Sequence, residues 1–346
     1  MVLKSCCSRL LKATSSVEAV RKVSGKSSKL LSIHDIKLVI SPNEKLIDDF
    51  MNGYGKQRLN FKRNDIDTWK ECFEGRYRLV FTCLKGSDRI IQTSHFLNYE
   101  AVAPHVDTTH QYQGFFWIDP EFRGQDSMKL VDYVTKNMLV NFSENGLAQC
   151  LPPSMNLWNK IYGHQRVGHV MNVSYYKPNE MRVPDELKFD GIFVRNAAEV
   201  PDVDIVKYDQ GIFPYERSAY ILRHLRDPAG FGKVAYDENG RVVGIGTVVI
   251  YPSGECVLTP LYADDKRVAQ AIFKCILQEM PLGDPKLLRF QIRSLDKMKD
   301  GFGWIQPFVS CPLRKEIMGY LVFSSHSPKI DYRKVFVNVP YTTSAI

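Results

Sequence analysis

The sequence predicts two α/β domains in tandem, each built on a mixed sheet with flanking helices. A chain of 346 residues is long for one domain and suits two domains of common size. A strand that ends at a proline and leads through a loop into a helix occurs twice, at Pro120 and Pro260. A hairpin precedes this unit both times, which indicates an internal duplication.

The first half shows alternating strand and helix patterns from residue 33 to residue 177. The spacing of apolar residues predicts strands at 36–40, 76–84, 89–98, 113–118, 147–151 and 168–176. It predicts helices at 43–52, 127–140 and 154–162. Residues 178–189 lack an apolar period and are predicted to be a linker.

The second half, residues 190–346, repeats this order. Strands are expected at 191–195, 233–236, 242–250, 255–258 and 287–292, and a helix at 264–279. Between the second and third of these strands, Asp237-Glu238-Asn239-Gly240 has the composition of a hairpin turn.

Most of the net charge of +8 lies in residues 1–32, which are expected to lie outside both domains. Seven Lys and Arg residues against one Glu give this segment a charge of +6, which leaves +2 for the rest of the chain. The folded part therefore lacks the basic surface that binds nucleic acid. The segment is rich in Ser and has the composition of a mitochondrial presequence or of a disordered basic tail.

The cysteines and the apolar runs indicate a soluble, intracellular protein. No C-x-x-C pair occurs among the eight cysteines, so a metal site is not expected. Reduced thiols that pack as small apolar groups suit a reducing compartment, cytoplasmic or mitochondrial. The longest apolar runs, at 78–84 and 242–250, are too short to span a membrane.

The stretch with the clearest chemistry surrounds Pro120, at residues 117–130. The strand stops at Pro120, and a polar turn then leads into a helix. Backbone N–H groups at such a helix start converge on one point, with the positive end of the helix dipole behind them. A pyrophosphate would be held there by the amides of residues 123–128, and the Arg123 guanidinium would add charge-assisted hydrogen bonds.

This loop, Ile118-Asp119-Pro120-Glu121-Phe122-Arg123-Gly124-Gln125, resembles the coenzyme A loop of the GNAT acetyltransferase superfamily. The order of strands and helices over 33–177 is similar as well. The resemblance implies that acetyl-CoA is the acyl donor, with its pyrophosphate on the loop and its pantetheine arm beside strand 113–118. The residues then expected to bind acetyl-CoA are Ile118, Arg123, Gly124, Gln125, Asp126, Ser127 and Met128.

Two residues of the loop depart from the family pattern, which has glycine where this chain has Asp126 and Met128. Asp126 brings a negative charge toward the phosphates. The repulsion is about 4 kcal/mol for charges ~4 Å apart at an effective dielectric of about 20. Binding in the family's mode is therefore expected to be weakened.

Tyr162 is the candidate catalytic residue. Many relatives place a tyrosine before the last Gly-Phe pair, as the general acid for the departing thiolate. Here that position holds Asn159, and Tyr162 directly precedes Gly163. A phenol has a pKa comparable with that of a thiol, so Tyr162 has the acidity to protonate the thiolate. A tyrosine that only packs is the alternative.

The second half resembles the C-terminal domain of tandem GNAT proteins over about 190–310. The match is clearest at Thr259-Pro260-Leu261-Tyr262-Ala263-Asp264-Asp265, where no Arg-Gly-Gln follows. Asp264 and Asp265 are expected to cap the helix and to repel phosphate. This half is therefore expected to form part of the acceptor cleft or to be purely structural.

Two functions follow from the resemblance. One is an N-acyltransferase that moves an acetyl or other short acyl group from coenzyme A to an amine, by direct attack of the amine on the thioester. The other is a degenerate GNAT-like protein that keeps the cleft as a ligand or partner site without turnover. The partners expected are acetyl-CoA and an amine, with no nucleic acid and no membrane. The motifs do not specify the amine or the oligomeric state.

Overall fold

The computed structural model describes residues 32–53, 61–102, 110–123, 130, 133–134, 145–150, 166–296 and 301–338. The predicted helices at 127–140 and 154–162 lie almost wholly outside these residues. None of the helices in the described part is long and apolar enough to cross a membrane.

The first half contains six strands and two α-helices within the described ranges. The strands are β1 (Ile36–Ile40), β2 (Tyr77–Leu84), β3 (Ile90–Tyr99), β4 (His110–Ile118), β5 (Asn145–Cys150) and β6 (Arg166–Tyr176). The helices are α2 (Glu44–Gly53) and α3 (Arg63–Cys72). The strand predictions of the first half are confirmed to within a few residues, whereas α3 was not predicted.

Among its described residues, the second half adds seven strands and three α-helices. The strands are β7 (Phe193–Asn196), β8 (Lys233–Tyr236), β9 (Val242–Ile250), β10 (Glu255–Ala263), β11 (Arg289–Leu295), β12 (Glu316–Phe323) and β13 (Val335–Val337). The helices are α6 (Asp202–Gln210), α7 (Ser218–Leu225) and α8 (Lys266–Glu279). Short 3-10 turns include η3 (Pro120–Phe122) and η8 (Tyr332–Lys334).

The prediction that the strand beginning at residue 255 stops at Pro260 was wrong. Strand β10 continues through the proline to Ala263. Its register with β9 shifts between Leu258 and Leu261, so Pro260 lies in an irregular stretch of the ladder. A proline is tolerated inside a strand at such a place, because no ladder hydrogen bond needs its missing N–H.

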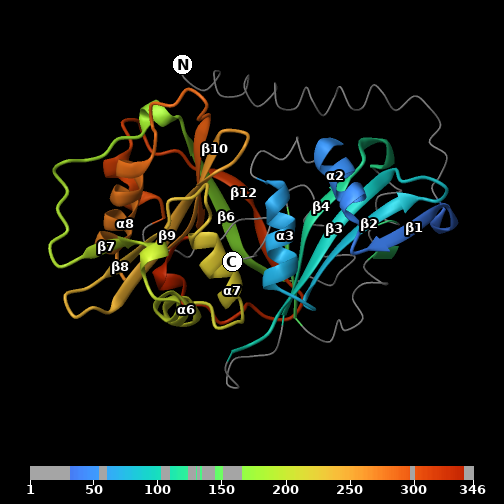
Figure 1. Cartoon of the computed structure of the whole chain (residues 1–346), viewed down its shortest axis with the longest axis horizontal. Coiled ribbons are helices and arrows are strands. Elements are labelled where there is room, and N and C mark those ends of the chain that lie inside the picture. Colours follow the sequence, from blue (N-terminus) through green and yellow to red (C-terminus); the bar gives the residue numbers. More distant parts are fainter. Residues whose placement is uncertain are drawn as a thin grey trace, which may run out of the picture.

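All thirteen strands belong to one continuous sheet (Figure 1). Its order is β1-β2-β3-β4-β5-β12-β6-β11-β10-β9-β8-β7, and β13 pairs with β10. The pairs β4–β5 and β10–β11 are parallel, and the other ladders are antiparallel.

The two halves exchange one strand each at the centre of this sheet. Strand β12, late in the chain, pairs with β5 of the first half, Leu321 lying opposite Gln149. Strand β6, the last of the first half, pairs with β11 of the second, Ile292 lying opposite Ser174. The sheet therefore does not divide at residues 178–189. The limits 33–177 and 190–346 stay a prediction about the chain, and strand pairing crosses them.

Helix α3 joins the halves on one face of the sheet and lies between them in Figure 1. The ring of Phe73, just after α3, packs 5.5 Å from that of Tyr220 on α7. At the start of α3, Lys62 forms an ion pair with Asp227 of the second half. One hydrophobic core consequently runs through both halves.

We predict that a nick in the segment 178–189 will not separate the halves. A protease recognition sequence inserted after Glu186, which is exposed, allows the folded chain to be cut there. Size-exclusion chromatography should then show one species of full size, because β6 and β12 still hold the fragments together. A denaturing gel should show two fragments. Two native peaks after cleavage would contradict the strand exchange.

We also predict that Asp65 makes stability depend on pH. Burial raises the pKa of Asp65 from an ordinary value of 3.8 to about 7, and the negative charge of Asp227 acts in the same direction. Lys62 acts in the opposite direction, through its positive charge and through its backbone amide, which donates to Asp65 Oδ2 at 2.8 Å. The folded state thus binds more protons than the unfolded state between those values. The contribution of Asp65 to the free energy of unfolding is therefore complete below about pH 4 and is lost as the pH rises through 7.

In urea unfolding, the Asp65→Asn variant should therefore lose less stability than the wild type between pH 4.5 and pH 7.5. Asp67→Asn is the matched control, because Asp67 lies on the same helix but is paired with Arg63 at 2.8 Å and is more exposed. Equal pH dependence in the wild type and Asp65→Asn would rule out this role.

Candidate active site

The predicted coenzyme A loop begins where β4 ends. The structure describes it as far as Arg123, whereas Gly124, Gln125, Asp126, Ser127 and Met128 lie outside the described residues, as does Tyr162. The side chain of Ile118 is buried. Arg123 is exposed and donates from Nε to the Ile118 carbonyl at 2.9 Å. Two of the predicted residues are thus brought together at the strand end.

The start of the loop is held by an arginine that sequence reasoning missed. Arg89, just before β3, donates from Nη2 to Asp119 Oδ2 at 2.8 Å and to Glu121 Oε2 at 2.6 Å. Asp119 also accepts the Glu121 amide at 3.0 Å, which caps η3. The two carboxylates raise the pKa of Arg89. The backbone that enters the loop is therefore fixed by charge-assisted bonds.

Strands β4 and β5 separate before the loop begins. Their parallel pairing runs only from His110 opposite Asn145 to Gln113 opposite Ala148. Residues 114–118 of β4 continue with no partner on the β5 side among the described residues. We call the end of this ladder, together with residues 114–118 of β4 that continue beyond it, the first splay.

A bulge in β4 borders the first splay. The register between β3 and β4 shifts between Thr93 and His95. Phe115 has a φ of 54°, a left-handed conformation that is uncommon for a bulky residue. The Thr93 hydroxyl donates to the Phe115 carbonyl at 3.0 Å and holds the bulge. Such strained backbone persists only where its surroundings hold it, and it is common at functional sites.

In the second half the corresponding parallel ladder also ends early, and another strand of the chain pairs beyond its end. Pairing of β10 with β11 ends at Val257 opposite Gln291. Strand β13 then pairs with the far end of β10, Val337 lying opposite Leu261. The Thr259 hydroxyl donates to the Asn338 carbonyl at 3.2 Å. The second splay is therefore closed by a strand that has no counterpart among the described residues at the first.

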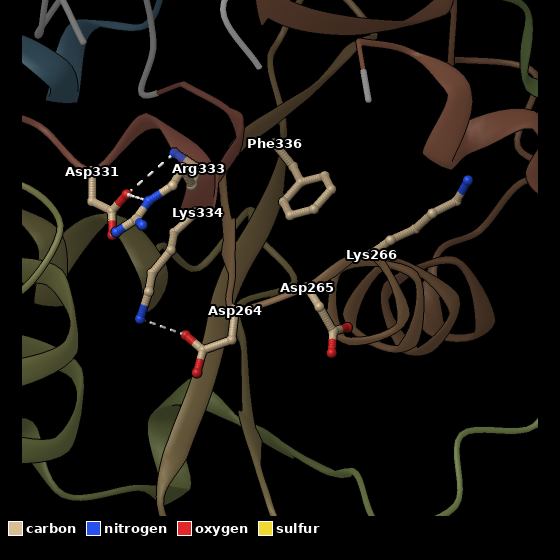
Figure 2. Close-up of a pocket in the computed structure, with 7 residues that line it drawn as sticks. All are labelled: Asp264, Asp265, Lys266, Asp331, Arg333, Lys334 and Phe336. Carbon is tan, nitrogen blue, oxygen red and sulfur yellow. Dashed lines mark hydrogen bonds and ion pairs between the residues drawn. The ribbon is translucent and has the colours of Figure 1, made fainter. Parts of the chain in front are cut away.

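A pocket of 730 Å³ lies beside this closed splay, at the start of α8 (Figure 2). Asp265 caps α8 by accepting the Val268 amide at 3.0 Å, as predicted. Asp264 does not cap. It accepts the Lys334 ammonium at 2.8 Å and the Tyr208 hydroxyl at 3.0 Å. The remaining lining residues are Lys266, Asp331, Arg333 and Phe336.

The charges around this pocket are largely compensated. Asp331 pairs with Arg333 at 2.8 Å, and Asp264 pairs with Lys334. Figure 2 shows both pairs as dashed lines. Asp264, Asp265 and Asp331 are balanced by Lys266, Arg333 and Lys334, so the lining carries no net positive charge to attract a pyrophosphate. No cluster that could hold a metal ion occurs among the described residues.

Comparison with known proteins agrees with this geometry. Residues 205–291 match the model of an acetyltransferase (GNAT) domain. Among solved structures, a "putative acetyltransferase" from Pyrococcus horikoshii is 15% identical, with a TM-score of 0.61 over 92% of this chain and 100% of that one. A tandem GNAT protein from the clavulanic acid biosynthesis pathway is 9% identical, with a TM-score of 0.61 over 84% and 97%.

A third solved structure, a protein of unknown function from Enterococcus faecalis V583 described as a probable N-acyltransferase, is 12% identical. Its TM-score is 0.53 over 83% of this chain and 71% of that one. At these identities the likeness concerns the fold. A search of curated proteins finds no match to this chain.

Fold, sheet order and matched domain define a GNAT superfamily protein with two GNAT-like domains in tandem. The predicted fold class and family resemblance are confirmed. Residues 33–212, just over half of the chain, match the model of the family described as "Protein of unknown function (DUF1248)", and the chain belongs to that family.

We predict that β13 is an integral part of the second half. Val337 is fully buried between neighbouring strands. In Val337→Asp a carboxylate must be buried there without a partner, which should cost several kcal/mol, roughly 3–5. Ile317→Asp is the control, because that β12 side chain is 57% exposed and its change should stay within about 0.5 kcal/mol. Equal losses in urea unfolding would contradict the prediction.

Proposed function

We propose that the first half transfers an acetyl or other short acyl group from coenzyme A to an amine. The observation that carries this proposal is the contrast between the two splays. The first splay has a bulged β4, an anchored loop entrance and no strand filling it among the described residues. The second is occupied by β13. A long, thin ligand such as the pantetheine arm suits the first alone.

The proposed binding mode follows the loop. The pantetheine arm lies beside residues 114–118 of β4, with Ile118 at its end. The pyrophosphate lies on the amides of Arg123, Gly124, Gln125, Asp126, Ser127 and Met128. Because Arg123 uses Nε for the Ile118 carbonyl, its two terminal nitrogens remain for phosphate oxygens.

The proposed reaction is direct attack of a neutral amine on the thioester carbonyl. The C–N bond forms, the C–S bond breaks, and the amine proton passes to water. Backbone N–H groups at the bulge polarise the carbonyl, and Tyr162 is the proposed donor of a proton to the departing thiolate. Such a site works mainly by holding the two reactants together, and so needs few ionisable side chains.

The runner-up function is a binding protein that keeps the cleft without turnover. Asp126 and Met128 favour it, because both replace the glycines that let the backbone approach phosphate closely. Asn159, at the family's tyrosine position, points the same way. In either case the proposed partners are acetyl-CoA and an amine or other ligand. The proposed compartment is cytoplasmic or mitochondrial, from the basic first 32 residues.

Titration calorimetry with acetyl-CoA and coenzyme A, followed by turnover assays over a panel of amines, separates these functions. The transferase should bind one acetyl-CoA per chain, because the second splay is filled, and should release free thiol with at least one amine. Binding without release of thiol would favour the runner-up. No binding of either nucleotide would refute the transferase and would leave only a runner-up that binds another ligand.

Two substitutions in the loop should move acetyl-CoA affinity in opposite directions. Asp126→Gly removes a negative charge near two phosphates, which after screening leaves about 1–2 kcal/mol, or roughly tenfold tighter binding. Arg123→Ala deletes charge-assisted bonds and should weaken binding by a comparable factor. Both effects should shrink at high salt.

Arg333→Ala is the matched control for Arg123→Ala. It removes an exposed arginine at the pocket of the second half, and acetyl-CoA affinity should stay unchanged. If neither loop substitution alters the affinity measured by calorimetry, the loop is not a phosphate site.

A further inference from the structure

A buried histidine lies against the bulge that borders the first splay. His95 is on β3, directly opposite Gly114 of β4. Gly114 is the first residue of β4 beyond its last pair with β5. A Cβ built on Gly114 would lie 2.5 Å from His95 Nε2, so the imidazole lies against the Gly114 backbone, in space that it shares with the Tyr112 ring. Nε2 therefore lies over the first residue of β4 that has no β5 partner among the described residues.

The imidazole has no hydrogen-bond partner within the described part of the chain. Its side chain is buried, at 1% exposure, and neither Nδ1 nor Nε2 is satisfied. Aromatic rings surround it. Trp69 and Tyr77 lie edge-on at centroid distances of 5.2 and 5.5 Å, and Phe115 is stacked at 5.8 Å. Burying a polar ring among these aromatic side chains costs folding free energy, because the ring loses its hydrogen bonds to water and gains none from the protein.

Burial also decides the charge of this ring. It lowers the pKa of His95 to about 3, so the imidazole is neutral at physiological pH. A neutral imidazole carries one N–H donor and one acceptor nitrogen. Its low basicity makes the ring a poor general base, and of its two nitrogens the N–H is the one that can bind a carbonyl oxygen.

We propose that His95 donates a hydrogen bond from its imidazole to the acyl carbonyl of the thioester, beside the bulge of β4. The inference rests on the proposed function and names a donor for it. When the amine attacks, the C–N bond forms and the carbonyl π pair moves to oxygen. The N–H of His95 stabilises that oxyanion until the pair returns and the C–S bond breaks. His95 keeps its proton throughout.

His95→Phe tests the proposal, because it keeps a flat ring and removes both nitrogens. The melting temperature should rise or stay the same, since an unsatisfied polar group is replaced by an apolar one of similar shape. The value of kcat should fall by about 10²–10³-fold, the usual effect of losing one oxyanion donor. KM should change little. A residue that only packs would not lower kcat while stability is kept.

The chain offers a matched control in His110. It is also 1% exposed with both ring nitrogens unsatisfied in the described chain, and it is caged by Tyr99 and Tyr215 at 5.0 and 4.4 Å. It lies at the other end of β4, opposite Asn145 and away from the splay. His110→Phe should therefore match His95→Phe in stability and leave kcat unchanged.

Isotope-edited infrared spectroscopy reads the hydrogen bond directly. The stretch of a ¹³C-labelled acetyl-CoA carbonyl should move to lower wavenumber on binding to the wild type. The shift should be smaller with His95→Phe and unchanged with His110→Phe. His95→Gln, which retains an N–H donor, should give an intermediate shift. It also serves as the test variant if His95→Phe does not fold.

The outcomes separate this inference from the proposed function. If the wild type transfers acetyl and His95→Phe keeps both its kcat and its carbonyl frequency, the role of His95 is overturned and the function stands. If the wild type binds acetyl-CoA without turnover, the infrared shift alone decides. A wild-type protein that binds no acetyl-CoA overturns both.

Discussion

The whole architecture depends on an exchange of strands at the centre of the sheet. Strand β12 completes the first half beside β5, and β6 completes the second half beside β11. Each also pairs with the other, so the two crossing strands are joined along their length. Because the sheet is continuous from one half to the other, the positions of both splays, of α3 and of the core between the halves all follow from this one arrangement.

The two halves share this arrangement of strands but differ in structure at their splays. Each has a parallel pair of strands that parts, a bulge on the longer strand and a helix or loop after it. In the first half the strand end is anchored by Arg89, and the opening is bordered by Phe115 and His95. In the second half β13 occupies the opening and carboxylates gather at the helix start. The family model that recognises an acetyltransferase domain matches this second half, the one whose splay β13 fills.

Local sequence predicted much of the fold. Apolar periodicity located most strands, and the proline-ended strand at Pro120 led to the family and to Ile118 and Arg123 as candidate site residues. Local sequence did not predict the elements and contacts that depend on residues far away in the chain. Helix α3 is rich in charged residues that pair with other elements, β12 and β13 follow long stretches without a regular apolar period, and strand exchange leaves no local pattern. Sequence analysis did not identify Arg89 and His95 for the same reason. Each lies against a residue of the neighbouring strand, and no local motif encodes the register between the two strands.

The strand exchange also constrains how such a chain can arise and be divided. A single ancestral domain that gave its last strand to an identical neighbour would have been an obligate dimer, and joining two copies end to end turns that dimer into one chain. Neither copy can afterwards be lost, because the survivor would expose the edges of β5 or β11, each with unpaired backbone groups that recruit foreign strands. The two halves therefore form an inseparable pair, in which β13 fills the splay of one half and no described strand fills that of the other.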